Sequence, residues 1–374
     1  MRSATLQAPT TVPFVALDRE HAEIASELRA AFERVVERSA FILGDELVAF
    51  EAEWAGTCGT AHCVGTASGT AALTLLLRAA GIGRGDEVIV PANTYIASAL
   101  AVVHAGAVPV LCDVEEGTGL IDPAAAGAAI GPRTAAIMAV HLYGQLCDMR
   151  ALRDLAARHG IALLEDAAQA HGATYHGQPA GGFGTGAAFS FYPSKNLGAL
   201  GDGGAVCTDH ADVADRVRQL RDLGQRRKGE HVLPGANERL DGLQAAFLRV
   251  KLPRLAAANA ARRRHAAVYR ERLEGTVGLL EERPASPCVY HLFPVRLAAR
   301  DAVAAQLAAR GIGVGLHYTP ALHQQPALRD LIQVPHEPVR AEAWAAEELS
   351  LPMSPRLDHE EIERVAQEVT ACVR

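Results

Sequence analysis

Residues 161–172 read IALLEDAAQAHG, a short apolar run that ends on two adjacent acids. An apolar run of this length, without alternation and closed by polar residues, is typical of a strand buried on both faces of a parallel sheet. The pattern before it, at residues 149–159, is helical, and similar pairs of strand and helix patterns precede it. The earlier strand patterns lie at 88–90, 108–111 and 135–140, and the earlier helical patterns at 97–105 and 123–129. This alternation predicts an α/β fold class, with a mostly parallel central sheet flanked by helices.

The pattern changes from about residue 239 onward. A long helical pattern rich in Ala and Arg, at 240–273 and interrupted at Pro253, leads away from the sheet. After it we expect strands at 289–297 and 312–317 and helices at 301–310, 341–348 and 359–373. The sequence therefore predicts two domains: a large α/β domain over residues 1–250, with an N-terminal helical arm, and a smaller C-terminal α+β domain over residues 251–374.

The composition argues against several classes of protein. With 49% hydrophobic and 21% charged residues, the chain of 374 residues can bury a large core. Its net charge of −7 argues against nucleic-acid and anionic-membrane partners, which need a positive surface. Prolines interrupt the longest uncharged stretch, and residues 1–11 lack the apolar run of a signal peptide, so we expect no membrane span and a cytoplasmic location. Seven cysteines without C-x-x-C spacing predict reduced thiols and no metal site.

Ligands of parallel sheets bind at the carboxyl ends of the strands. We therefore expect functional residues in the segments that follow a strand or begin a helix. Ser68-Gly69-Thr70 precedes a helical run at 71–80. Free backbone N–H groups and the helix dipole at such a turn can hold a phosphate. An ordinary helix N-cap is the alternative interpretation of these residues.

A carboxylate and a lysine follow further along the chain. Asp166 stands at the end of an apolar run, where it could bind a metal, act as a general acid–base, pair with a protonated ring nitrogen, or simply cap a helix. Lys195 follows aromatic residues; burial there would favour the free amine that forms Schiff bases, whereas an exposed loop lysine is the alternative. A phosphate cradle, a carboxylate and such a lysine are together what pyridoxal phosphate (PLP) requires.

Over nearly its whole length the chain resembles the DegT/DnrJ-type sugar-nucleotide aminotransferases, within the fold type I, aspartate aminotransferase superfamily. This resemblance implies the large and small domains expected above, and PLP, converted to pyridoxamine phosphate (PMP), as cofactor. The segments that carry it are VPF at 12–14, FILG at 41–44, SGT at 68–70, GDEVIVP at 85–91, VHLYG at 140–144, EDAAQAHG at 165–172, the stretch 190–204, NERLD at 237–241, HY at 317–318 and LSLP at 349–352.

The resemblance also implies roles for single residues. Lys195 matches the lysine that binds PLP covalently and moves the proton between substrate and cofactor, and Asp166 matches the partner of the pyridine nitrogen. A sister group with the same fold has histidine in place of this lysine and dehydrates sugars instead of aminating them. The presence of Lys195 therefore argues against a dehydratase. The remaining cofactor residues implied are Gln169 for the ring hydroxyl, Tyr95 for stacking on the ring, and Gly69, Thr70 and Ser190 for the phosphate.

Other matches concern the partner subunit and the substrates. Asn237 matches a phosphate ligand donated by the second subunit of a homodimer, and Arg239 lies beside it. Tyr318 and His323 match positions near the amino donor or the sugar. Arg226, Arg227 and Lys228 form a basic stretch that could face a diphosphate, although a solvated charge run is the favoured interpretation.

The function implied is amino transfer to a nucleotide-linked keto-6-deoxyhexose, with dTDP as the favoured nucleotide and glutamate or glutamine as donor, in a ping-pong reaction through PMP. The stretch 191–204 is more similar to family members that aminate the 3-keto position. Three alternatives stay open: a 4-keto sugar nucleotide, a cyclitol ketone, or a PLP-binding regulatory protein without turnover. The high content of Ala, Gly and Arg points towards antibiotic biosynthesis in a high-GC bacterium.

Overall fold

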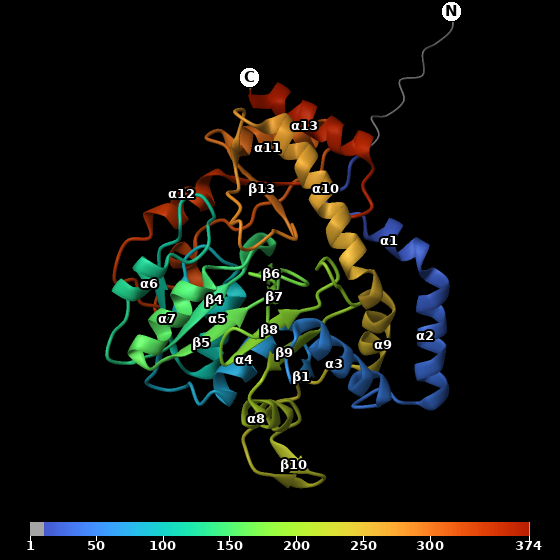
Figure 1. Cartoon of the computed structure of the whole chain (residues 1–374), viewed down its shortest axis with the longest axis vertical. Coiled ribbons are helices and arrows are strands. Elements are labelled where there is room, and N and C mark those ends of the chain that lie inside the picture. The colour runs from blue at the N-terminus through green and yellow to red at the C-terminus, as the bar shows by residue number, and fades with distance from the viewer. Residues whose placement is uncertain (1–10, 374) are drawn as a thin grey trace, which may run out of the picture.

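The computed structural model describes residues 11–373, so residues 1–10, where no targeting signal is expected, lie outside the described part. Its central sheet consists of β1 (His62–Thr66), β2 (Glu87–Pro91), β3 (Val108–Cys112), β4 (Thr134–Val140), β5 (Ala162–Asp166), β8 (Gly186–Ser190) and β9 (Gly204–Thr208). They lie in the order β1-β9-β8-β5-β4-β2-β3 (Figure 1). All pairs from β3 to β8 are parallel, and β9 runs antiparallel to β8 and β1. The predicted α/β fold class with a mostly parallel sheet is confirmed.

Helices pack against this sheet. They are α3 (Asp45–Cys58), α4 (Gly69–Ala79), α5 (Ile96–Ala105), α7 (Met149–His159) and α8 (Ala211–Arg221), with the short α6 (Pro123–Ala128) packed on α7. Local chemistry fixes the ends of α7: Asp148 accepts a hydrogen bond from the N–H of Ala151 at 3.0 Å, and Gly160 ends the helix in the left-handed conformation. The helical pattern predicted at 149–159 matches α7, and those at 97–105 and 123–129 match α5 and α6 within one residue.

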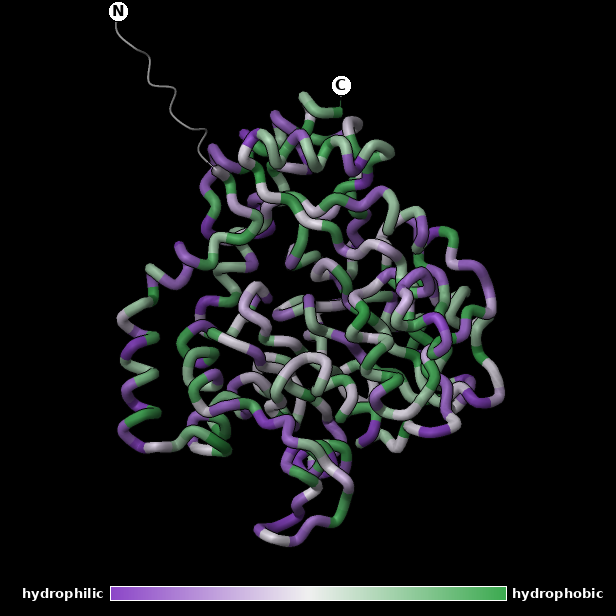
Figure 2. Tube along the Cα trace, turned by 180° about the vertical axis from the view of Figure 1, so that it is seen from behind, coloured by the Kyte–Doolittle hydropathy of each residue, from purple (hydrophilic) through white to green (hydrophobic). Residues whose placement is uncertain are grey.

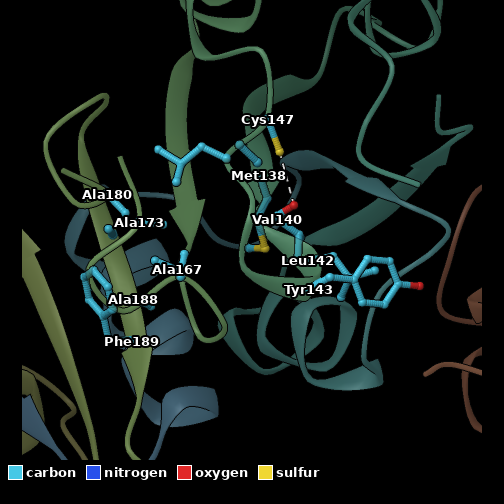
Figure 3. Close-up of a cluster of buried hydrophobic side chains, with 14 of the residues drawn as sticks. Met138, Val140, Leu142, Tyr143, Cys147, Ala167, Ala173, Ala180, Ala188 and Phe189 are labelled. Carbon is cyan, nitrogen blue, oxygen red and sulfur yellow. Dashed lines mark hydrogen bonds between the residues drawn. The ribbon is translucent and has the colours of Figure 1, made fainter. Parts of the chain in front are cut away.

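Burial on both faces explains why the strands do not alternate. Every residue of β2 is buried, and β4 has one half-buried position. Figure 3 shows the core beside β4, where the thiol of Cys147 donates a hydrogen bond to the carbonyl oxygen of Val140 at 3.1 Å. Each large apolar side chain buried in this way stabilises the fold by roughly 1.5–3 kcal/mol. The sheet is thus a rigid support for whatever lies at its edge.

The C-terminal part begins with an interrupted helix, as the pattern at 240–273 predicted. Helix α9 (Gly242–Lys251), a 3₁₀ turn (Leu252–Arg254) and α10 (Leu255–Leu273) lead from the large sheet to a small antiparallel sheet (Figure 1). That sheet consists of β12 (Gly278–Leu279), β13 (Phe293–Arg296) and β14 (Glu348–Leu351), accompanied by α11 (Arg300–Ala309), α12 (Val339–Glu347) and α13 (His359–Val373). The domain boundary at residue 250 falls at the end of α9 and stays a prediction.

Of the strands predicted in this part, one is shorter than expected and one does not form. Of the strand expected at 289–297, only Phe293–Arg296 forms, because the N–H groups of Val289 and His291 donate to Gly144 and Tyr143 instead. The run at 312–317 forms no strand, since its backbone is divided between isolated bridges to residues 12 and 350. Strand β14 was not predicted, because its residues continue the apolar pattern of α12. In each case the hydrogen-bond partners come from distant parts of the chain.

Two peripheral features frame the sheet. Helix α1 (Leu17–Glu23) leads into α2 (Ala25–Arg38), which packs its apolar face on Ala246 and Phe247 of α9. At the opposite end from the C-terminus, the hairpin of β10 (Gln225–Arg227) and β11 (Glu230–His231) projects from the body, and Figure 2 shows that its tip is hydrophilic. A second small hairpin pairs β6 (Thr174–Tyr175) with β7 (Gln178–Pro179). No helix within residues 11–373 is long and apolar enough to cross a membrane.

Candidate active site

A cavity of about 500 Å³ lies where β2, β4, β5 and β8 end. The parallel register places Val140 beside Asp166, and Asp166 beside Ala188, so residues from three strands meet at one edge. This is the expected position for a ligand of a parallel sheet. Eight of the eleven candidate residues line the cavity: Gly69, Thr70, Tyr95, Asp166, Gln169, Ser190, Lys195 and Tyr318.

The carboxylate of Asp166 is buried at the end of β5. Its Oδ2 accepts a hydrogen bond from the hydroxyl of Ser98 at 2.7 Å, and its Oδ1 accepts one from the N–H of Ala168 at 3.2 Å. Ser98 in turn lies 2.9 Å from the hydroxyl of Thr94, which fixes its orientation. Burial raises the pKa of Asp166, while the Ser98 and Ala168 hydrogen bonds and the charge of Lys195 oppose that rise. A cationic group bound against this carboxylate would keep it ionised.

The adjacent acid, Glu165, points to the other face of the strand, as alternation requires. It is fully buried and lies 3.0 Å from Nε2 of His141, and it accepts hydrogen bonds from the N–H groups of Gly181 and Phe183. Since Nδ1 of His141 accepts from the N–H of Cys147 at 3.3 Å, Nε2 carries the proton that Glu165 accepts. Glu165 is thus a structural acid, and within residues 11–373 no group of three or more His, Cys, Asp or Glu residues could hold a metal.

Lys195 lies on the loop after β8, and packed aromatic rings fix the start of this loop at Phe191. Phe191 packs edge-on against Trp54 at 5.5 Å and against Phe50 at 5.2 Å between ring centroids. Burial lowers the pKa of Lys195 to about 8, against the opposing attraction of Asp166. Near neutral pH a usable fraction of the amine is therefore unprotonated, which is the form that attacks a carbonyl.

This pKa predicts that Lys195 becomes reactive at a lower pH than a free lysine. The chain has three lysines, of which Lys228 is exposed and Lys251 is buried in an ion pair with Glu20 at 2.9 Å. When cofactor-free protein is labelled with trace acetic anhydride, labelling of Lys195 should rise about tenfold between pH 7 and pH 9. Mass spectrometry of the three peptides measures this, with Lys251 as the shielded control. A labelling midpoint above pH 10 at Lys195 would contradict the prediction.

The start of α4 forms a close-fitting turn. Ser68 caps the helix by accepting a hydrogen bond from the N–H of Ala71 at 3.1 Å, so the N-cap interpretation holds for this residue. A Cβ added to Gly69 would lie 2.6 Å from Cβ of Ser190, and one added to Gly204 would lie 2.3 Å from the carbonyl oxygen of Ser68. These glycines let β8, β9 and the helix N-terminus approach closely, and Gly69, Thr70 and Ser190 line the adjoining part of the cavity, where a helix N-terminus can hold an anion.

An aromatic pair and an amide stand on the walls of the cavity. The ring centroids of Tyr95 and Tyr318 lie 5.1 Å apart, and Tyr95 is 54% exposed, so a flat ligand can reach it. The amide of Gln169 is oriented at both ends: it accepts from the N–H of Tyr143 at 2.6 Å and donates to the hydroxyl of Tyr318 at 2.8 Å. His171 supports the site from below, since it hydrogen-bonds the carbonyl of Ser190 at 2.8 Å and burial lowers its pKa to about 3.

Three predicted residues are not brought to the cavity within one chain. Asn237 is exposed, on a segment whose neighbour Glu238 accepts a hydrogen bond from the N–H of Ala67 at 2.9 Å. Arg239 forms an ion pair with Asp222. His323 lies 2.7 Å from Oε1 of Glu342 and does not line the cavity. The basic stretch also lies elsewhere: Arg226 and Arg227 both pair with Glu230 on the projecting hairpin.

Sequence reasoning missed several residues that line or support the cavity. Ser98 was overlooked because a hydroxyl that serves a distant acid leaves no motif. Ser98 does lie three residues after Tyr95, one helical turn into α5, which is a signal that could have been used. No role was predicted for further lining residues that lie far along the chain from the strand ends, in the N-terminal arm and the C-terminal part: Phe14, His291, His317 and Met353.

The residues present fit PLP. The N-terminus of α4, where a Cβ at Gly69 would meet Ser190, suits its phosphate, a buried carboxylate suits its ring nitrogen, and a lysine with a lowered pKa suits its aldehyde. Tyr95 and Tyr318 provide the aromatic wall that a planar ring needs. The cavity therefore has one group for each part of this cofactor.

Comparison with known proteins agrees with this geometry. The model of the DegT/DnrJ/EryC1/StrS aminotransferase family matches residues 22–370. The chain is 47% identical over 360 residues to a dTDP-3-amino-3,4,6-trideoxy-alpha-D-glucose transaminase of Streptomyces venezuelae, which covers 96% of this chain and 95% of that protein. It is 46% identical over 356 residues to the erythromycin biosynthesis sensory transduction protein EryC1 of Saccharopolyspora erythraea, covering 95% and 97%. The crystal structure of S. venezuelae DesV superposes with a TM-score of 0.95 at 46% identity, covering 97% of this chain and 99% of that one.

Proposed function

Because the chain belongs to the DegT/DnrJ/EryC1/StrS aminotransferase family and is a PLP-dependent sugar aminotransferase, we propose that it aminates the C3 ketone of a dTDP-linked keto-6-deoxyhexose. The observation that carries this proposal is the 47% identity, over 96% of this chain, to a transaminase named for a dTDP-3-amino sugar. The stretch 191–204, which resembles that of 3-keto enzymes, supports the same position. Amination at C4, or of a cyclitol, would use the same cofactor residues.

The candidate residues for the cofactor each have a task in this reaction. When bound, PLP withdraws electrons from the carbon that loses its proton. Lys195 would hold the cofactor covalently, and its Nζ, when free, would take up and return that proton. Asp166, fixed by Ser98, keeps the ring nitrogen protonated. Backbone N–H groups at Gly69 and Thr70, together with the Ser190 hydroxyl, hold the phosphate.

The second subunit enters through Asn237. This residue is exposed and lies outside the cavity of its own chain, so it is free to complete the phosphate site of a neighbouring copy. Arg239, close to it in sequence, would lie at the same interface. We therefore propose a homodimer with shared sites. We also propose a cytoplasmic location, since all seven cysteines are free thiols, as a reducing compartment permits. Substrate contacts by Tyr318 and His323 are proposals of the same kind, and Tyr318 has the stronger support because it lines the cavity.

The test is a two-step spectroscopic experiment. Purified protein with PLP should show a visible absorption band, and glutamate should convert that band to the PMP spectrum. Adding a dTDP-3-keto-6-deoxyhexose should then restore the first spectrum and yield an amino sugar, with the 4-keto isomer as the matched comparison. If only the 4-keto sugar restores it, the C3 assignment is wrong. If glutamine but not glutamate acts, only the donor changes.

One comparison favours a second candidate, a regulatory protein. EryC1, at 46% identity, is named for sensory transduction. A PLP-binding regulator would need the same cradle, carboxylate and lysine, so the cavity alone does not separate the two. The first step of the experiment does, because a protein without turnover keeps its PLP band when glutamate or glutamine is added.

A further inference from the structure

Strand β14 carries a buried acid, Glu348, that none of these roles uses; only 1% of its surface is exposed. Its Oε2 accepts a hydrogen bond from the backbone N–H of His317 at 2.5 Å, and its Oε1 accepts one from the hydroxyl of Ser350 at 2.5 Å. The same hydroxyl lies 2.8 Å from Nδ1 of His317. Since His317 lines the cavity, these residues form a hydrogen-bonded chain from a buried carboxyl group to the wall of the site.

Neighbouring residues hold both the imidazole and the backbone of His317. Phe14 stacks on it at 5.6 Å with an interplanar angle of 13°, and Tyr143 donates its hydroxyl proton to the His317 carbonyl at 2.8 Å. A Cβ at Gly315 would lie 2.6 Å from Cε1 of the ring, so the backbone fits closely beneath it. Of the two ring nitrogens of His317, Nδ1 has the Ser350 hydroxyl as its partner, whereas Nε2 has no hydrogen-bond partner among residues 11–373. It is therefore the atom that His317 can offer to a ligand in the cavity.

We propose that Glu348 is a positioning residue which, through Ser350, decides whether His317 presents a hydrogen-bond donor or an acceptor to the sugar nucleotide; the inference rests on the proposed function for the identity of that ligand. When Glu348 is ionised, Ser350 donates to Oε1, so Nδ1 must hold the ring proton and Nε2 is an acceptor. When Glu348 is protonated, it donates to Ser350, which turns its own proton towards Nδ1. Nδ1 then gives up its proton and Nε2 takes one up from water in the cavity, so the ring stays neutral. Between the two states the protein therefore gains one proton, which resides on Glu348.

The surroundings place this exchange in an accessible pH range. Burial raises the pKa of Glu348 to about 8, although the hydrogen bonds from His317 and Ser350 oppose the rise. Burial lowers the pKa of His317 to about 4, so the ring stays neutral while Glu348 titrates. His317 thus presents a donor below pH 8 and an acceptor above it. Other charged or titratable groups also face Glu348. Nη1 of Arg300, on α11, donates to the backbone carbonyl of Glu348 at 2.9 Å, and Arg296 is the cross-strand partner of Glu348. The remaining two are Tyr143 and Tyr318.

Kinetics against pH test the proposal. In the wild type the KM for the keto-sugar nucleotide should rise about tenfold between pH 7 and pH 9.5, with kcat changing less, because a hydrogen bond to the substrate is lost. Glu348→Gln fixes the donor form, since its amide donates to Ser350 at every pH, and should keep the low KM throughout. The control Glu347→Gln alters the adjacent acid, which binds Arg296 at 2.9 Å, and should follow the wild type. A Glu348→Gln variant that keeps the wild-type rise would overturn the proposal.

A second measurement needs no turnover. In ¹⁵N-histidine-labelled, PLP-loaded protein, the Nδ1 and Nε2 resonances of His317, assigned by their loss in His317→Gln, should exchange character between pH 6.5 and pH 9.5. Ser350→Ala, which interrupts the chain even where Glu348→Gln fails to fold, should abolish that exchange. A wild-type ring that keeps one tautomer throughout overturns the relay. A tautomer exchange in a protein that aminates no nucleotide sugar leaves the relay intact and refutes the proposed function instead.

Discussion

Replacing Lys195 by Ala is expected to lower the rate of amino transfer by about 10³-fold or more while the protein stays folded. The variant loses both the covalent hold on PLP and the amine that moves the proton, and general acid–base catalysis alone contributes roughly 10²–10⁴-fold. Stability should not fall, because burial lowers the pKa of Lys195 to about 8, which means that the fold disfavours its ammonium form. Turnover of the keto-sugar nucleotide and the melting temperature measure the two effects.

A matched variant separates charge from chemistry in this experiment. Lys195→Arg keeps a cation of similar length opposite Asp166, but a guanidinium stays protonated and neither attacks a carbonyl nor carries the proton. It should therefore be as inactive as the alanine variant. Either variant retaining more than about a tenth of wild-type turnover would show that Lys195 is not the catalytic amine, whatever the spectrum of the bound cofactor.

The central sheet could be predicted because its signal is local. Each of the strands β2 to β5 is a short apolar run, and burial on both faces is what removes alternation from such runs. The segments at 289–297 and 312–317 look equally apolar, yet their backbone partners lie at residues 143–144, 12 and 350. An apolar pattern indicates that a segment is buried, but it does not indicate which segment its backbone pairs with. For this reason the strands of the large sheet were predicted well and those of the small sheet were not.

The same distinction applies to the site. Asp166 and Lys195 could be found because each follows a strand within a recognisable run, and the sheet register then brings them to one cavity. Glu348 could not be found, since its importance depends on a backbone N–H 31 residues away, and Ser98 was missed because the acid that it serves lies 68 residues along the chain. Asn237 is an intermediate case, because its motif is visible in the sequence but the residue lies outside the cavity of its own chain. It could have the predicted role only in the site of a second copy.

Replacing Asp166 by Asn is expected to reduce turnover by about 10²–10³-fold, the range found when a charge-stabilising group is removed from an active site. The amide has nearly the same shape and can still accept from Ser98, so the fold and the cavity should persist. It carries no negative charge, however, and cannot keep a pyridine nitrogen protonated. PLP should therefore bind with at most a modest loss of affinity while both half-reactions slow together, which stopped-flow absorbance with glutamate and then with the keto sugar would measure.

Ser98→Ala is the matched control for this prediction, because it removes one hydrogen bond and leaves the carboxylate in place. Burial already raises the pKa of Asp166, and the Ser98 hydroxyl is the first of the groups that oppose that rise. Its loss should raise this pKa further in the free protein, yet a bound cation would still ionise the acid, so turnover should fall less than tenfold. If the charge of the carboxylate is what matters, turnover should therefore decrease in the order wild type, Ser98→Ala, Asp166→Asn. If Ser98→Ala were as inactive as Asp166→Asn, the geometry of the carboxylate, rather than its charge, would be what the reaction requires.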